Sequence, residues 1–290
     1  MKAISNEKND TALTPNNHIL QEWRDSAEYW EKHAQTIRTM FAPVTKALIE
    51  EAEIVEGDKV LDVAGGPGEP SLTIAEFVGP TGSVTFTDAV AKMVQAAERE
   101  ASRRGITNIS FQQCSADALP FEDQQFDVAV SRLGVMFFPD PVASLREMLR
   151  VIKHEGTISL AVWGKSDLNP FSYAVTNIVS RYIESPPADP NAPGAFRFAE
   201  PGALSQVLTA AGAQSVTERL LQFHIEAAIN PREFWEVRSQ TSGTLREKLE
   251  KLPKEVATRI TEEIENELVE FFPNNQMKFP AQMLVVTGTK

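Results

Sequence analysis

The stretch from Val60 to Ser71, VLDVAGGPGEPS, constrains the fold more than any other part of the chain. Its first residues are apolar and β-forming, which indicates the end of a buried strand, and a helix is expected to begin near Pro70. Between them, the run from Ala64 to Gly68 contains three glycines. Such a backbone can turn sharply and pass close beneath a ligand, where a Cβ atom would collide with it. The stretch predicts a strand, a tight turn and a helix at a binding site, although a glycine turn without a ligand has the same pattern.

Strands and helices alternate beyond this loop, in the pattern of an α/β fold with a mostly parallel sheet and crossover helices. Further strands are predicted at residues 83–88, 109–113, 126–131, 157–163, 214–225 and 283–287. Helices are predicted at residues 71–78, 91–104, 141–151 and 201–211. The chain is therefore expected to fold around one Rossmann-like sheet.

The remaining segments are predicted to precede or interrupt this core. Residues 1–18 are polar and are expected to be a disordered leader. Residues 19–52 are expected to form helices that are broken at Pro43. These helices either cover a cofactor as a lid or pack on the sheet. The cofactor-binding core is expected at 53–164, continued at 200–229 and completed by a final strand in 280–290. Residues 165–199, rich in proline, are predicted to be a cap insertion with a helix near 173–183, and 230–279 a helical insertion.

Composition narrows the classes of partner and location. The net charge of −12 opposes a broad surface for nucleic acid, and no apolar run approaches the roughly 20 residues of a membrane span. Cys114 is the single cysteine, which fits a reducing cytoplasm. No paired cysteines or His-x-x-x-His cluster indicates a metal site. These features favour a metal-independent cytoplasmic protein with a small-molecule partner, no nucleic acid and no membrane span; a homodimer is left open.

Two acidic residues give the glycine loop a chemical meaning. Asp88 lies 20 residues after Gly68 at the end of the next strand, where a carboxylate can accept hydrogen bonds from both ribose hydroxyls of a nucleoside. Gly66, Gly68 and Ser71 lack the third glycine of a dinucleotide fingerprint. Asp62, just before the turn, would repel a pyrophosphate but could bind an ammonium group directly or through water. The two carboxylates therefore indicate S-adenosylmethionine as the ligand of the loop.

These residues resemble the class I S-adenosylmethionine-dependent methyltransferases, and most closely the branch of the ubiquinone and menaquinone biosynthesis C-methyltransferases. VLDVAGGPG is similar to the family's first motif, with Ala64 where the first glycine is usual, a departure that the turn tolerates if the φ angle is negative. TFTDAVAKMV and CSADALPFEDQQFDVAVS resemble the motifs of the next strands, and SRLGVMFFPDP the segment after them. The resemblance covers roughly residues 42–216 and the final strand. It implies a seven-stranded sheet whose last strand is antiparallel and inserted between its neighbours.

The resemblance also implies the cofactor contacts, with S-adenosyl-L-homocysteine as the product. Either Ser115 or Asp117 is expected to meet the adenine amino group. The expected cofactor-binding residues are Asp62, Ala64, Gly65, Gly66, Gly68, Asp88, Ala89, Met93, Ser115, Ala116, Asp117 and Ser131.

Catalytic residues are harder to read, because methyl transfer can rely on positioning alone. His33 is the best candidate base and Arg132 a candidate for steering an anionic or phenolate acceptor, although a capping histidine and a structural ion pair are the alternatives. The predicted acceptor pocket contains Tyr29, Trp30, Met136, Trp163 and Phe171, unless these apolar residues are core.

The predicted function is therefore methyl transfer from S-adenosylmethionine to a small hydrophobic or aromatic acceptor, at carbon or oxygen. A catalytically inactive cofactor-binding regulator or scaffold is the first alternative. An NAD(P)-dependent oxidoreductase is the second.

Overall fold

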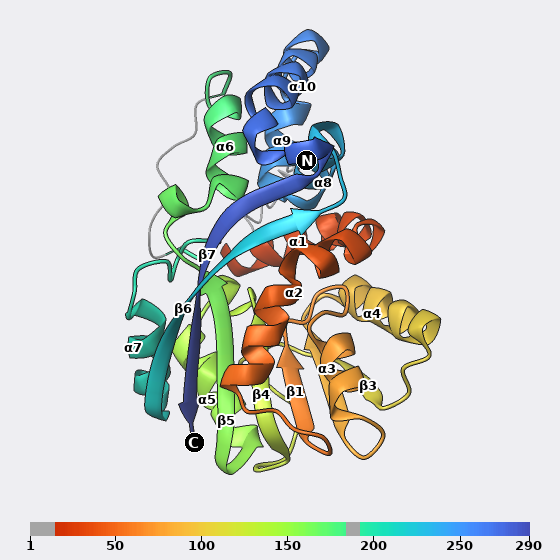
Figure 1. Cartoon of the computed structure of the whole chain (residues 1–290). Helices are drawn as coiled ribbons and strands as arrows, with labels where there is room; N and C mark the ends of the chain where they lie inside the picture. The colour runs from red at the N-terminus through yellow and green to blue at the C-terminus, as the bar shows by residue number, and fades with distance from the viewer. Residues whose placement is uncertain (1–14, 184–191) are drawn as a thin grey trace, which may run out of the picture.

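A computed structural model describes residues 15–183 and 192–290, and over these ranges the chain forms one seven-stranded sheet in the order β3-β2-β1-β4-β5-β7-β6 (Figure 1). The strands are β1 Lys59–Val63, β2 Ser83–Asp88, β3 Ile109–Gln113, β4 Phe126–Arg132, β5 Ile152–Trp163, β6 Gln214–Ala227 and β7 Met277–Thr289. Strands β1 to β5 pair in parallel, and β7 runs antiparallel between β5 and β6. The predicted fold is confirmed, including the inserted last strand.

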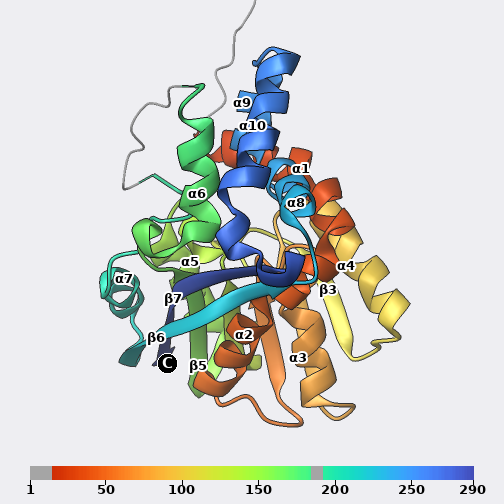
Figure 2. The same cartoon turned by 45° about the horizontal axis from the view of Figure 1, so that its top comes forward.

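Helices cover both faces of this sheet (Figures 1 and 2). They are α1 Pro15–Lys32, α2 Ala34–Glu51, α3 Ser71–Val78, α4 Ala91–Arg104, α5 Pro141–Val151, α6 Pro170–Val179, α7 Ala203–Ala211, α8 Pro231–Thr241, α9 Gly243–Glu250 and α10 Lys254–Glu267. Short 3-10 helices lie at η1 Val135–Phe137, η2 Ser166–Leu168, η3 Val269–Phe271 and η4 Pro273–Asn275. Helices α2 and α3 lie on one face and α5 and α7 on the other, while α4 packs against β2 and β3.

Local sequence explains where the core helices begin and end. The Asp140 side chain accepts a hydrogen bond from the backbone N–H of Ala143 (2.9 Å), and Pro141 then opens α5 with its fixed φ. Helix α4 ends at Gly105, whose φ of 68° is the left-handed conformation that glycine adopts without strain. Both helix boundaries agree with the sequence prediction.

The helices α1, α6, α8, α9 and α10 form a cap beyond the carboxyl ends of the parallel strands (Figures 1 and 2). The long antiparallel strands β6 and β7 extend from the sheet into this cap. Within the cap, helix α1 is joined to helix α8 by two contacts. Trp30 Nε1 donates to the Thr241 carbonyl (2.9 Å), and Lys32 pairs with Glu236 (2.6 Å). The cap therefore combines the first helix with segments more than 200 residues later in the chain.

The predicted helix break at Pro43 is wrong. Helix α2 runs through Pro43, and the two N-terminal helices are instead separated at His33. Proline removes one backbone donor, but Phe41, Val44 and Leu48 on the same helix are all buried against the core, and this packing keeps the helix continuous. Of the two predicted roles for these helices, α2 packs on the sheet and α1 lies in the cap.

Several other boundaries differ from the prediction. Helix α1 begins at Pro15, so the expected disordered leader (1–18) overlaps a helix by four residues, and its first 14 residues lie outside the described part of the chain. Helix α6 begins three residues earlier and ends four residues earlier than expected, at Pro170 and Val179, and part of the predicted cap insertion (184–191) is also outside the described residues. Strand β5 begins five residues earlier, at Ile152, because the turn from Lys153 to Gly156 belongs to the strand ladder.

The last strands are longer than expected as well. Strand β7 begins at Met277, inside the predicted helical insertion, because it pairs with β6 as far as Ala227. In the two described ranges, no helix combines the length and the apolar character that crossing a membrane requires.

Candidate functional site

The glycine loop after β1 is held against the end of β2 by backbone hydrogen bonds. Gly65 N donates to the Thr87 carbonyl (3.1 Å) and Gly66 N to Asp88 Oδ2 (3.0 Å). A Cβ at Gly65 would lie 2.4 Å from the Phe86 ring, so that position must be glycine. At Gly66, by contrast, a Cβ would meet nothing within 4 Å. The loop is therefore packed below and open at Gly66, as a cradle for a ligand requires.

Asp88 stands at the carboxyl end of β2, beside this opening. Its Oδ1 accepts a hydrogen bond from Val90 N (2.8 Å) while Oδ2 accepts that of Gly66. Burial raises the pKa of Asp88 to about 6. Each carboxylate oxygen has a second acceptor position, so the group can also accept the hydroxyls of a ribose.

Asp62 lies at 0% exposure beneath the loop. Its Oδ2 accepts hydrogen bonds from Ser71 Oγ (2.6 Å) and Ser71 N (3.2 Å), which joins β1 to the start of α3. Its Oδ1 is buried without a hydrogen-bond partner in the described chain, and burial raises the pKa of the carboxyl group to about 7. A buried acceptor of this kind requires a donor. The site therefore fits a ligand that brings a cationic hydrogen-bond donor, such as the ammonium group of S-adenosylmethionine.

The shifted pKa of Asp62 predicts a pH-dependent effect of the Asp62→Asn substitution. The folded pKa of about 7 exceeds the ordinary value of 3.8, so the folded protein binds the proton more tightly than the unfolded chain and Asp62 destabilises the fold progressively as pH rises from about 4 to about 7. Asparagine keeps an acceptor for Ser71 but carries no charge. When both proteins are melted at pH 5 and at pH 8, the melting temperature of the variant relative to that of the wild type should be higher at pH 8 than at pH 5. A stability difference that is the same at both pH values would contradict this.

Ala64 has a φ angle of 62°, so the negative φ under which the sequence could tolerate alanine here is not found. This left-handed conformation brings the Cβ of Ala64 beside Gly134, where a second Cβ would lie only 2.7 Å away. A left-handed alanine costs about 1–2 kcal/mol. The surrounding loop therefore holds Ala64 in a backbone conformation that suits glycine better than alanine.

The Ala64→Gly substitution is expected to stabilise the protein by about 1 kcal/mol, since relief of the left-handed strain exceeds the entropy that glycine loses on folding. Thermal or urea unfolding of the ligand-free protein measures this change in stability. Ala210→Gly, at an exposed position inside α7, is the matched control and should destabilise by about 1 kcal/mol. Destabilisation by both substitutions would refute the strain at Ala64.

The predicted adenine-side residues lie around the ends of β2, β3 and β4. Ser115 Oγ donates to the Asp117 carboxylate, and both residues are exposed, so either one is available to a ligand. Ser131 Oγ donates to the Val63 carbonyl (2.7 Å) and ties β4 to β1. Ala89 and Ala116 are partly buried, and Met93 is buried with Ala27 and Val90.

Trp23 is a site residue that the predicted set lacks. Its ring packs edge-on against Phe137 (5.1 Å) and tilted against Trp30 (5.6 Å), and it also contacts the cluster around Met93. Helix α1 thus covers the side of the site between the adenine-side residues and η1. The spacing of Trp23 and Trp30, seven residues or two helical turns, was the available signal, because it places both rings on one face.

The two candidate catalytic residues have defined partners. His33, at the junction of α1 and α2, shares a hydrogen bond with Gln240 Oε1 (2.8 Å). Arg132 donates to Thr45 Oγ1 (2.8 Å) and to the Glu69 carbonyl (3.2 Å), and burial lowers the pKa of this arginine. Arg132 therefore joins α2 to the glycine loop.

Three of the predicted acceptor-pocket residues are buried together in one core cluster at the carboxyl ends of β4 and β5, namely Met136, Trp163 and Phe171. Trp163 and Phe171 are stacked (6.1 Å between ring centres, 15° between planes), and Phe41 packs edge-on against both (5.8 and 6.2 Å). We call Phe41, Trp163 and Phe171 the aromatic wall. Met136 is buried in the same core cluster, whereas Tyr29 and Trp30 lie on α1, where Tyr29 packs under the Arg246 guanidinium (4.9 Å).

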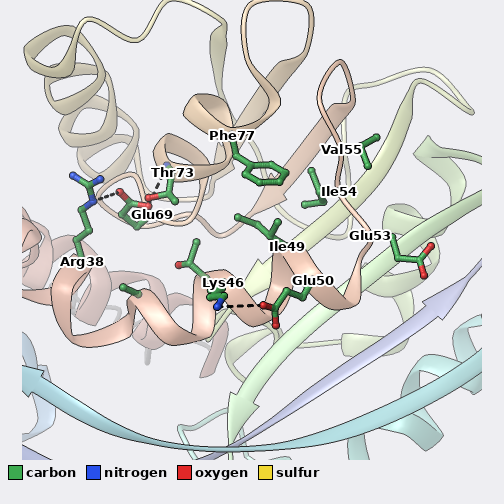
Figure 3. Close-up of a pocket in the computed structure, with 12 residues that line it drawn as sticks. Arg38, Lys46, Ile49, Glu50, Glu53, Ile54, Val55, Glu69, Thr73 and Phe77 are labelled. Carbon is green, nitrogen blue, oxygen red and sulfur yellow. Dashed lines mark hydrogen bonds and ion pairs between the residues drawn. The ribbon is translucent and has the colours of Figure 1, made fainter.

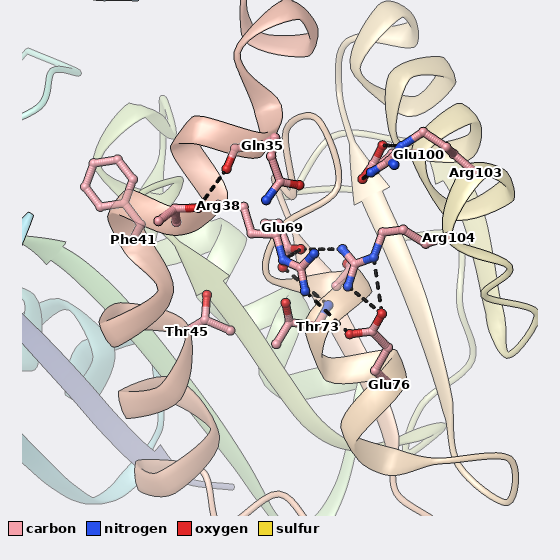
Figure 4. A network of polar contacts seen from close by, with 12 residues as sticks. Gln35, Arg38, Phe41, Thr45, Glu69, Thr73, Glu76, Glu100, Arg103 and Arg104 are labelled. Carbon is pink, nitrogen blue, oxygen red and sulfur yellow. Dashed lines mark hydrogen bonds and ion pairs between the residues drawn. The ribbon is translucent and has the colours of Figure 1, made fainter. Parts of the chain in front are cut away.

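Glu69, in the glycine loop, anchors three helices in a polar network (Figure 4). Its Oε1 accepts from Arg104 Nη1 of α4 (2.6 Å) and pairs with Arg38 Nε of α2 (3.3 Å), and Oε2 accepts from Thr73 N of α3 (3.3 Å). Glu69 and Arg104 are 9% and 7% exposed, so this pair is well protected from solvent. The network ties the glycine loop to α2, α3 and α4. Sequence spacing did not indicate it, because its members come from separate segments of the chain.

A cavity of about 580 Å³ lies between α2 and α3 (Figure 3). Its lining includes Ile49, Val55 and Phe77, together with Glu69 at one end. None of the predicted site residues lines it, so this groove on the face of the sheet is separate from the candidate site.

Part of the chain is similar in sequence to known proteins. Residues 54–177 match a family described as a methyltransferase domain. An uncharacterised protein of Mycobacterium bovis is 38% identical over 131 residues, which are 45% of this chain and 46% of that protein. A ubiquinone/menaquinone biosynthesis C-methyltransferase of Xanthomonas oryzae is 40% identical over 106 residues, 36% of this chain and 42% of the enzyme. The matches thus span less than half of the curated relatives' length.

The fold has counterparts among solved structures. Phosphoethanolamine N-methyltransferase 2 of Haemonchus contortus, solved in complex with S-adenosyl-L-methionine, superposes with a TM-score of 0.55 at 15% identity, over 97% of this chain and 60% of that one. At this identity the likeness concerns the fold alone. The matched domain, its motifs and the sheet order agree with one another. Residues 54–177 therefore resemble a methyltransferase domain in sequence, and the fold of the chain resembles that of a solved methyltransferase.

Proposed function

We propose that this protein transfers a methyl group from S-adenosylmethionine to a small hydrophobic or aromatic acceptor, at carbon or oxygen. The observation that carries the proposal is the pair of carboxylates at the glycine loop. Asp88 stands beside the open cradle at Gly66, and Asp62 keeps a buried oxygen without a donor. A ribose and an ammonium group together satisfy both carboxylates, and a pyrophosphate does not.

Bound S-adenosylmethionine would supply a methyl group activated by a sulfonium. Asp88 would hold the ribose, Asp62 the ammonium group, and Ser115 or Asp117 the adenine, with Met93 and Trp23 against the ring. The aromatic wall would exclude water and place the acceptor, and positioning of this kind can provide much of the acceleration. Arg132 as a steering cation and His33 as a base are the proposed catalytic residues.

Two measurements test the proposal. Calorimetric titration should show binding of S-adenosylhomocysteine and none of NADH. A panel of hydrophobic and aromatic acceptors, incubated with S-adenosylmethionine, should yield at least one methylated product. Binding of the demethylated cofactor without turnover of any acceptor would favour an inactive regulator or scaffold, and binding of NADH would favour an oxidoreductase.

The single cysteine and the net charge of −12 support further proposals about the setting of this reaction: a cytoplasmic location, no nucleic-acid partner and no metal requirement. In the two described ranges, no group of three or more His, Cys, Asp or Glu side chains is arranged to hold a metal ion.

A further inference from the structure

Helix α8 carries an arginine on the face that packs inward. Phe234 is at 0% exposure and Thr241 is buried, and Arg238 lies four residues after the first and three before the second. Residues at this spacing lie on one face of a helix. Arg238 therefore occupies a position where the rest of the helix presents buried side chains.

The guanidinium group of Arg238 lies against the aromatic wall. Its central carbon is 4.8 Å from the ring centre of Phe171, which stacks on Trp163. Its Nε is buried without a hydrogen-bond partner, and among the described residues the side chain has neither an acceptor nor a carboxylate. Burial lowers the pKa of Arg238 to about 10, which leaves the group charged at neutral pH.

A partly buried guanidinium whose Nε has no acceptor is costly to the fold. Buried charges in proteins are normally paired, and contact with one aromatic ring offsets only a part of the lost hydration. Among other arginines of the cap, Arg181 pairs with Glu263 and Glu267, and Arg246 donates to the Gln240 carbonyl and to Ser26 Oγ. Arg238 has neither a carboxylate nor a neutral acceptor among the described residues, and an anion from outside the chain would supply an acceptor.

A second cation lies at the other end of the aromatic wall. The guanidinium carbon of Arg132 is 6.0 Å from the ring centre of Phe41. Its hydrogen bonds run to neutral oxygens, and the Glu69 and Asp62 carboxylates lie near enough to interact with its charge. The aromatic wall therefore has an arginine near each end, and of these two only Arg238 lacks a nearby carboxylate among the described residues. The charge of Arg238 favours a ring-bearing anion over a neutral or cationic molecule at its end of the wall.

We propose that Arg238 binds the carboxylate of a small aromatic acid, whose ring lies along Phe41, Trp163 and Phe171, and that this acid is the methyl acceptor. The planar fork of a guanidinium group matches a carboxylate with two parallel hydrogen bonds. The inference deepens the proposed function and rests on it, because it names the acceptor class of the same site.

The test compares aromatic acids with their neutral amides. Benzoate, 4-hydroxybenzoate, 1-naphthoate and indole-3-acetate, each beside its carboxamide, are titrated into the full-length protein saturated with S-adenosylhomocysteine. At least one acid should bind, and its amide should bind roughly 10- to 100-fold more weakly, the range expected when a charge-assisted bond is lost. Phenol, titrated alongside, tests whether a phenolate is the recognised anion instead.

Two substitutions assign the effect to Arg238. Arg238→Met should weaken binding of the acid to the level of the amide and leave the affinity for S-adenosylhomocysteine unchanged. Arg232→Met, at an 81% exposed arginine of the same helix, removes an equal charge and should change neither. Arg238→Lys keeps the charge without the fork and should give an intermediate affinity, which provides a second variant if the methionine variant does not fold.

A stability measurement separates ligand binding from a structural role. If Arg238 awaits a ligand, the ligand-free Arg238→Met protein should melt at or above the wild type, because an unpaired buried charge has been removed. The proposal is overturned if no acid binds while S-adenosylhomocysteine does, if acids and amides bind alike, if phenol binds best, or if Arg238→Met binds the acid normally. Failure of S-adenosylhomocysteine to bind would instead refute the proposed function.

Discussion

Asp88→Ala is expected to weaken the binding of S-adenosylhomocysteine by roughly 10- to 100-fold, equivalent to about 1.5–3 kcal/mol for the loss of charge-assisted hydrogen bonds. Two causes add up. The substitution removes the proposed acceptor for the ribose, and it also frees Gly66 N and Val90 N, which hold the loop in shape. Calorimetric titration measures the affinity directly.

Asp127→Ala is the matched control for Asp88. Asp127 also accepts a backbone hydrogen bond, from Lys59 N (3.0 Å), and it pairs with Lys153, but it lies at the opposite end of the strands. Its loss should lower stability without changing affinity for the cofactor. Equal affinity in the wild type and in Asp88→Ala would show that the carboxyl end of β2 does not carry the ribose site.

Glu69→Ala is expected to destabilise the fold by about 3 kcal/mol, the lower end of the range for breaking a buried ion pair from one side. Arg104 would keep only the more exposed Glu76 as a partner, and Arg38 would lose its link to the glycine loop (Figure 4). The melting temperature should fall by roughly 6–10 °C. The affinity for S-adenosylhomocysteine should fall as well, because the loop loses its anchor.

The control for Glu69 is Glu226→Ala, which removes a glutamate from an exposed pair with Lys278. Exposed pairs contribute little, so its melting temperature should match that of the wild type. If Glu69→Ala melts like this control, the network under the loop does not stabilise the protein.

The sheet was predictable from sequence because each of its signals is local. The turn at Gly105, the cap at Asp140 and the alternation of apolar strands with amphipathic helices depend on residues close in the chain. The carboxylates Asp62 and Asp88 were found in the same way, since strand ends fix where they lie. Boundaries were missed where packing overrides local preference, as at Pro43 inside α2.

The partners of the site residues were not predictable, because they depend on contacts between distant segments. Nothing near Glu69 in the sequence indicates Arg38 or Arg104, and nothing near His33 indicates Gln240. The φ of Ala64 was also missed, since the surrounding loop fixes the backbone there against the preference of the side chain. The position of Arg238 was missed for the same reason, because nothing near it in the sequence indicates that its side chain lies against Phe171.

The part of the cap above the site is held together by hydrogen bonds between α1 and α8. Trp30 bonds to Thr241, and His33 bonds to Gln240. These contacts join residues 207 to 211 positions apart, whereas Gly66 and Asp88 in the floor are only 22 apart. During synthesis from the N-terminus, the floor is complete in sequence long before α8 emerges from the ribosome. In the nascent protein, helix α1 can therefore pack on α4 over the glycine loop well before α8 supplies the remaining contacts.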